Sequence, residues 1–136
     1  MGLNTRLGAV CRNTQLDALN ALVNGGKLSI YSGTQPTDPD TSIGDSTLLA
    51  EFTLPTPCFA AASAGVLTAN AITSVGAVLS GTAAWFRIWN AGKTVGYIDG
   101  SVGTVGCNMN LNSVAISSGA TVSVTSFTHT LPLQGA

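Results

Sequence analysis

Apolar residues recur with helical spacing only near the start of this chain. From Leu16 to Val23, leucine and valine return every three or four residues, which is the spacing of one helix face. Asn13 is of a type that caps helix starts, and the glycine pair after the segment is typical of a helix end. The pattern therefore predicts one helix over residues 13–24, preceded by an extended arm over residues 1–12.

Beyond residue 26 the apolar and polar residues alternate instead, and this spacing of two is typical of half-buried strands. Glycine, proline and asparagine punctuate the alternation roughly every 8–12 residues, as in sandwiches built from short strands. The strands expected from this pattern cover residues 27–31, 48–54, 66–71, 72–79, 84–89, 93–99, 108–112, 114–116 and 120–131.

The succession of elements favours an all-β fold. We expect an antiparallel β-sandwich, of jelly-roll or immunoglobulin-like topology, with one short N-terminal helix. Residues 13–136 would form this single domain, helix included, and the arm would extend from it. The side chains expected in the core are those of Leu28, Ile30, Leu48, Phe52, Phe86, Ile88, Val122 and Val124.

Charged residues are sparse in this chain. They make up 8% of the 136 residues, against roughly 25% in typical soluble domains. The net charge is −1 and the basic residues are scattered, so the basic footprint that nucleic-acid binding requires is missing. We therefore expect no nucleic-acid partner. A neutral surface of this kind instead suits burial against protein partners, because charges are depleted at interface cores.

The start of the chain lacks the charged and then apolar pattern of a secretory signal peptide. No apolar run approaches the ~18 residues of a membrane span. We therefore expect a protein made and kept in a cytoplasm, with no membrane partner. Its three cysteines, Cys11, Cys58 and Cys107, would be reduced and mostly buried, the alternative being an intersubunit disulfide formed after release.

Candidate catalytic and metal-binding groups are few. His129 is the only histidine, no G-x-S-x-G motif accompanies it, and its alternating segment predicts a solvent-facing or edge position on a strand. Asp38, Asp40 and Asp45 share one loop but lack the residue order of a calcium-binding loop. We therefore expect no catalytic residue, no metal site and no cofactor.

Trp85, Arg87 and Trp89 are spaced so that they share one face of a strand. One interpretation is an exposed aromatic platform for a sugar or a partner protein, aided by cation–π contact. The interpretation we favour is that both indoles belong to the core and that Arg87 covers its edge.

The N-terminal arm is the second candidate for partner contact. It has too little apolar content to order itself, so we expect it to become ordered only against a neighbour. Leu3, Leu7 and Val10 would supply apolar anchors on that neighbour. Arg6 and Arg12 would pair with acidic groups there.

Segments spread over residues 13–132 resemble a known family of proteins. They are LSIYSGTQPTDPDT, LLAEFTL, GVLTANAITS, GTAAWFRIWN, IDGSVG and MNLNSVAISSGATVSVTSFTHTLP. The chain is similar through them to small structural proteins encoded in tailed-phage and prophage gene clusters. The resemblance rests on the whole length of the chain and not on one motif, and it carries over no ligand residues.

The resemblance implies a virion component without enzymatic activity, made in the cytoplasm of a bacterial host. The expected role is that of a capsid decoration (cement) protein that binds and stabilises the head shell. Its partners would be the major capsid protein or other virion proteins, and sister copies as a homo-oligomer on the particle. A neck, tail or fibre-associated subunit is the first alternative. A carbohydrate-binding module that uses Trp85 and Trp89 is the second.

Overall fold

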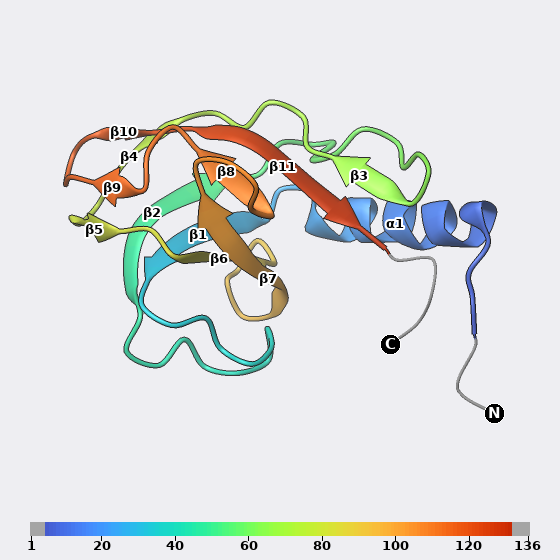
Figure 1. Ribbon diagram of the computed structural model, residues 1–136, viewed down its shortest axis with the longest axis horizontal. Coiled ribbons are helices and arrows are strands. Elements are labelled where there is room, and N and C mark those ends of the chain that lie inside the picture. The colour runs from blue at the N-terminus through green and yellow to red at the C-terminus, as the bar shows by residue number, and fades with distance from the viewer. Residues whose placement is uncertain (1–4, 132–136) are drawn as a thin grey trace.

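The computed structural model describes residues 5–131, which form one helix and a set of short strands (Figure 1). The protein is therefore mostly β, as the alternation of apolar and polar residues predicts. In chain order the elements are α1 (Ala9–Val23), β1 (Lys27–Ser32), β2 (Thr47–Thr53), β3 (Val66–Thr68), β4 (Val75–Gly76), β5 (Gly81–Thr82), β6 (Trp85–Trp89), β7 (Gly96–Gly103), β8 (Met109–Leu111), β9 (Ala115–Ile116), β10 (Thr121–Val122) and β11 (Val124–Thr130).

Seven of the strands form one sheet in the order β2-β1-β6-β7-β8-β11-β3. This sheet is mixed, so the expectation of a purely antiparallel arrangement is wrong at one pair, β7 and β8, which run parallel. The loop between them doubles back, and the side chain of Asn108 accepts a hydrogen bond from the backbone N–H of Ser101. Strand β8 therefore starts beside the end of β7, with Met109 next to Val102, and continues in the same direction.

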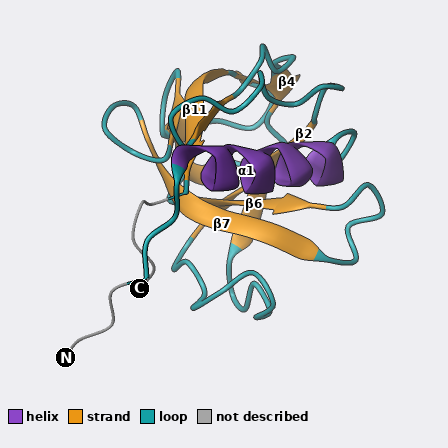
Figure 2. Ribbon diagram, turned by 90° about the vertical axis from the view of Figure 1, so that its right-hand side faces the viewer, coloured by secondary structure: helices purple, strands orange, loops and turns teal. Residues whose placement is uncertain are grey.

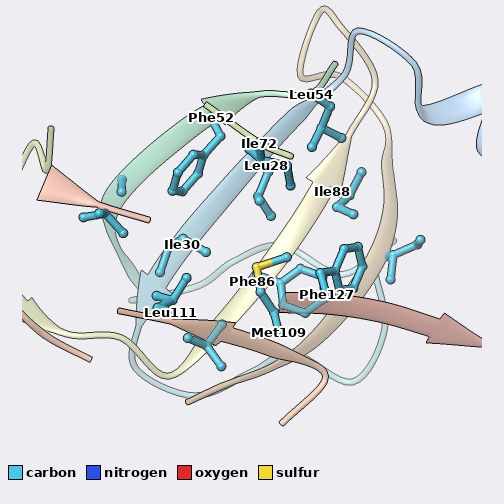
Figure 3. Close-up of a cluster of buried hydrophobic side chains, with 14 of the residues drawn as sticks. Leu28, Ile30, Phe52, Leu54, Ile72, Phe86, Ile88, Met109, Leu111 and Phe127 are labelled. Carbon is cyan, nitrogen blue, oxygen red and sulfur yellow. The ribbon is translucent and has the colours of Figure 1, made fainter. Parts of the chain in front are cut away.

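The core lies inside the curl of this sheet. Strands β8 and β11 cross over β1 and β6, and the apolar side chains of both layers meet between them (Figure 3). The rings of Phe86 on β6 and Phe127 on β11 meet edge to face, with their centroids 5.2 Å apart. Six of the side chains expected in the core are buried, namely Leu28, Ile30, Phe52, Phe86, Ile88 and Val122.

Leu48 and Val124 are only half-buried, which corrects the expected core at two positions. On β2 the cause is a bulge, where the register shifts between Ile30 and Tyr31 of the paired strand β1. An extra residue in one strand reverses the alternation of faces beyond it. Leu49 is consequently the fully buried residue there. Val124 packs against the margin of the core.

Helix α1 begins at Ala9, four residues before its expected start at Asn13, and it ends at Val23. Residues 9–12 therefore belong to the helix and not to an extended arm. The backbone N–H of Arg12 already donates to the carbonyl of Gly8, at 3.0 Å. Asn13 lies within the helix, so it does not cap the helix start. Its side chain instead accepts a hydrogen bond from the backbone N–H of Gly65.

That bond is one of a row in which polar side chains of α1, and of Asn24 just after its end, bind the backbone of residues 58–65. Asn20, Asp17 and Asn13 are spaced three or four residues apart and so share one face of the helix, and Asn24 continues the row. Their side-chain oxygens accept the backbone N–H groups of Cys58, Phe59, Ala62 and Gly65, at 2.9–3.0 Å. We call these four side chains the polar ladder. It fixes α1 along one end of the molecule, beside β3 (Figures 1 and 2).

Replacing Asn20 with alanine should destabilise the protein more than a change on the opposite face of α1. The Asn20 amide both donates to the carbonyl of Phe59 and accepts from its N–H, each at 3.0 Å. Leaving such buried backbone groups unpaired costs about 1–3 kcal/mol. The exposed Gln15→Ala control should stay within about 0.5 kcal/mol of the parent protein. Urea unfolding measures the free energy of unfolding of both variants. Equal losses for Asn20→Ala and Gln15→Ala would show that the ladder does not hold the helix.

Candidate functional site

Trp85, Arg87 and Trp89 lie on the face of the sheet that points away from the core. Their neighbours on β6, Phe86 and Ile88, point into the core instead. The favoured interpretation, in which both indoles belong to the core, is therefore wrong about the face, and it is right about burial for Trp85 but not for Trp89. Trp85 is 1% exposed and Arg87 is 2% exposed, while Trp89 is half-buried.

The guanidinium of Arg87 lies between the two indoles. Its central carbon is 5.3 Å from the ring centroid of Trp85 and 5.2 Å from that of Trp89. The ring of Tyr31, from the adjacent strand β1, stacks on Trp85 at 4.5 Å. We call Tyr31, Trp85, Arg87 and Trp89 the aromatic–arginine cluster. It forms a second packed layer, outside the main core, in which a cation is held against two electron-rich rings.

Asp99 on β7 neutralises the buried charge of Arg87. Register places the two residues opposite one another on paired strands. The Nε atom donates to Oδ1 at 2.6 Å and a terminal nitrogen donates to Oδ2 at 2.8 Å, in a bidentate pair with both side chains at most 3% exposed. The hydrogen bond that Arg87 donates to Asp99 is the main cause that raises the pKa of Arg87. Arg87 and Asp99 therefore form a buried ion pair. The sequence alone does not indicate this pair, because Asp99 lies twelve residues after Arg87 on another strand.

The loop over residues 33–46 covers this cluster. The backbone carbonyl of Asp38 accepts a hydrogen bond from Arg87 at 3.1 Å, and the hydroxyl of Ser46 accepts one from the indole N–H of Trp85 at 3.1 Å. The carboxylate of Asp38 accepts from the backbone N–H of Asp40 and the hydroxyl of Thr41. The acidic side chain therefore shapes the loop itself.

A cleft of about 470 Å³ opens beside the loop, between residues 39–43 and the turn at residues 93–96. Trp89 lines it, and the ammonium of Lys93 lies 5.6 Å from the centroid of that indole. Lys93 also pairs with Glu51 at 2.8 Å. Both cations of the cleft, Arg87 and Lys93, already have carboxylate partners, so neither offers a free positive charge to an anionic ligand.

His129 is half-buried on β11, so the solvent-facing position expected of it is wrong. The alternative, an edge position, holds on one side of the strand, because β11 pairs with β3 at His129 but with β8 only as far as Phe127. His129 lines a second cleft, of about 410 Å³, together with Cys107 and Asn108. Burial lowers the pKa of its imidazole below the ordinary 6.5.

The lowered pKa of His129 predicts a loss of stability in mild acid. The folded state disfavours the charged imidazole, so the unfolded chain binds the proton more tightly. The stabilisation is complete above pH 6.5 and is lost as the pH falls through the lower folded-state pKa. Urea unfolding across this range should show a steeper acid loss for the parent protein than for His129→Gln. Parallel pH profiles would contradict the assignment.

The three cysteines are free and occupy different environments. Cys58 is buried, and burial raises the pKa of its thiol to about 11. Cys107 is half-buried, whereas Cys11 is exposed on α1. The expectation that the cysteines are mostly buried is therefore wrong for Cys11, because its part of the chain is helical and that helix face has no cover.

The residues expected to anchor the N-terminal arm on a neighbour differ in their exposure. Leu3 lies outside the described residues, Arg6 is exposed and Leu7 is half-buried. Val10 is 81% exposed on α1. Arg12 is turned toward the body of the protein, where it donates to the carbonyl of Ala64 at 3.4 Å. Among the expected partner-contact residues that the structure describes, Val10 is therefore the most exposed apolar one.

Within residues 5–131, no three His, Cys, Asp or Glu side chains lie close enough together to hold a metal ion. The same residues contain no helix with the length and apolarity needed to cross a membrane. No protein-family model, curated protein or solved structure matches the chain.

Proposed function

We propose that this chain is a non-enzymatic structural protein of a tailed-phage virion, and that it decorates the capsid. In this role it binds the outside of the head shell and stabilises contacts between neighbouring capsomers. It is made in the cytoplasm of the bacterial host and ends its path on the particle. Its partners are the major capsid protein or other virion proteins, and sister copies. The sequence resemblance motivates the proposal.

The observation that carries the proposal is the uncharged outer face of α1. The charged residues of the helix, Arg12 and Asp17, both bind the backbone of residues 58–65. The remaining exposed side chains of the helix carry no charge, and two of them, Val10 and Leu22, are 81% and 55% exposed. Charge-poor surface with accessible apolar groups is typical of the centre of a protein interface. The exposed residues in question are Ala9, Val10, Cys11, Thr14, Gln15, Ala18, Ala21 and Leu22.

The attachment test uses undecorated heads mixed with purified protein, followed by sedimentation and measurement of occupancy. Because α1 starts at Ala9, the informative truncation removes residues 1–7 and leaves the helix intact. We expect this variant to stay folded and to show lower occupancy. The double substitution Val10→Ser with Leu22→Ser should lower occupancy further. Normal occupancy for both variants would contradict attachment through this end of the molecule.

The first alternative keeps the same surface but changes the partner, whereas the second uses another surface. A neck, tail or fibre-associated subunit would use the same uncharged helix face, and copy number distinguishes it from a decoration protein. A carbohydrate-binding module has less support, because Trp85 is buried beneath the loop and only Trp89 lines an open cleft. Binding of simple sugars to the parent protein, abolished by Trp89→Ala, would favour the module.

The architecture supports a sandwich. We propose that the two layers of the curled sheet, which meet at Phe86 and Phe127, are the layers of a β-sandwich. The jelly-roll and immunoglobulin-like topologies are the two alternatives for its connections. Either topology would have to include the parallel pairing of β7 with β8.

A further inference from the structure

We propose that the second cleft, between β7 and β11, is a docking slot for an extended, uncharged segment of another protein, which pairs with both strands. Strand β8 pairs with β7 only at Val102 and Gly103, and with β11 only as far as Phe127. Beyond the start of β8, both longer strands continue, and Figure 1 shows β11 extending past β8. The inference concerns the shape of the sheet and does not rest on the proposed function.

Strand β8 shows how wide this slot is. It lies between β7 and β11, and its first residue, Met109, pairs with Val102 on one side and with Phe127 on the other. Neighbouring strands are about 4.8 Å apart, so the edges of β7 and β11 are two such spacings apart where β8 begins. The cleft that continues from this point is lined by residues of both strands. Its width therefore admits one extended chain and excludes the edge of a second folded sheet.

Alternate backbone groups of β7 face the slot. The N–H of Val102 donates to the carbonyl of Ala84, toward β6, whereas the N–H of Ser101 donates to the side chain of Asn108 on the opposite side. Because backbone groups alternate between the two sides of a strand, those of Asp99 point the same way as those of Ser101. Along residues 96–101, β7 pairs only with β6 among the described strands. This edge of β7 is therefore open to a further strand.

The facing edge of β11 is open in the same way. The N–H of Leu131 and the carbonyl of Phe127 both form hydrogen bonds with residues that flank β3. The same alternation turns the backbone groups of Thr128 and Thr130 toward the slot. Over residues 128–130, β3 is the only described strand that pairs with β11. Two unpaired strand edges therefore face one another across the cleft.

The floor of the slot is apolar. Gly100 has no side chain, and a Cβ atom there would collide with the ring of Phe86, so this ring reaches the cleft beneath β7. Asp99 is the only carboxylate on the lining, and it is bonded to Arg87. Burial lowers the pKa of His129 below 6.5, so its imidazole is uncharged at neutral pH. A charged side chain would lose hydration in the slot without gaining a partner.

These features select the chemistry of the occupant. An extended peptide carries N–H and C=O groups along both of its edges at the spacing of a strand, so it can pair with β7 and β11 at once. Its alternate side chains would point toward Phe86 on the floor and toward solvent on the other face. The occupant is therefore a flexible segment without charged side chains, with an apolar side chain at the position that enters the slot.

Peptide binding to the parent protein tests the slot. The probe is a blocked, uncharged peptide of about five residues in which valine alternates with threonine, long enough to span the slot at about 3.3 Å per residue. The control peptide has the same side chains with N-methyl groups on alternate backbone nitrogens, so one of its edges cannot pair. Amide hydrogen exchange of the protein is followed by NMR.

We expect the probe to slow the exchange of the Asp99, Thr128 and Thr130 N–H groups. The effect should be about tenfold when the peptide is at about ten times its dissociation constant, because about nine-tenths of the slots are then filled. The N-methylated peptide should leave these exchange rates unchanged. No slowing with millimolar probe would overturn the proposal, as would equal slowing by the two peptides.

A pair of variants at Thr130 tests the backbone contact from the side of the protein. Thr130→Pro removes the N–H that faces the slot, and proline is tolerated at an open strand edge. We expect this variant to keep the circular dichroism of the parent protein and to lose the peptide's effect at Thr128. Thr130→Val keeps the N–H and should bind like the parent. Parent-like binding by folded Thr130→Pro would also overturn the proposal, and if that variant does not fold, the two peptides decide.

Discussion

Replacing Asp99 with alanine should lower the free energy of unfolding by about 3–5 kcal/mol, because it leaves a buried guanidinium without its partner. Arg87 and Asp99 are bonded through two nitrogens, and their side chains are 2% and 3% exposed. The loop carbonyl of Asp38 and the two indoles around Arg87 cannot neutralise its charge. Urea unfolding at neutral pH measures the loss.

Two controls separate burial from charge in that experiment. Glu51→Gln breaks the half-exposed pair with Lys93, whose side chain is 33% exposed, and should cost at most about 1 kcal/mol. The double variant Arg87→Met with Asp99→Leu leaves no charge behind and should recover most of the stability lost by the single change. Equal losses for Asp99→Ala and Glu51→Gln would contradict the account of the buried pair.

Replacing Phe86 with alanine should also cost about 3–5 kcal/mol, the range for removing a large ring from a well-packed core. Phe86 is 1% exposed, lies edge to face with Phe127, and packs against Gly100, where a side chain would collide with its ring. The void left by alanine lies between the two layers of the core. Chemical denaturation measures this loss in the free energy of unfolding.

Val95→Ala is the matched control for the phenylalanine variant, since Val95 is 47% exposed and should change stability by no more than about 0.5 kcal/mol. A loss below about 1 kcal/mol for Phe86→Ala would show that β6 presents its other face to the core. Trp85 would then be the residue whose removal is most costly.

Local periodicity was sufficient to locate the helix and most strands. The change of spacing near residue 26 marks the end of α1 and the start of β1. A helix or strand that is buried on one face repeats its apolar residues with its own period, which differs between the two kinds of element. Periodicity could not show the bulge opposite Ile30, which exchanges Leu49 for Leu48 in the core. A bulge is set by how two strands pair, and that pairing is absent from the pattern of either strand alone.

The surroundings of the candidate site depended on contacts between distant segments. Trp85, Arg87 and Trp89 share a face as the alternation predicts, but their burial comes from the loop over residues 33–46. The polar ladder was hidden for a similar reason. Asparagine and aspartate on a helix ordinarily indicate a solvated face, and only the position of residues 58–65 shows that these side chains bind backbone.

The proposed function places this chain in the particle of a tailed phage or prophage, and its most direct test is the number of copies of the chain in such particles after purification. Quantitative mass spectrometry against the major capsid protein gives this number. The account predicts copies in the hundreds, which remain with the heads through density-gradient purification. A dozen or fewer would assign the chain to the neck or a fibre. Its complete absence from purified particles would contradict a structural role in the virion.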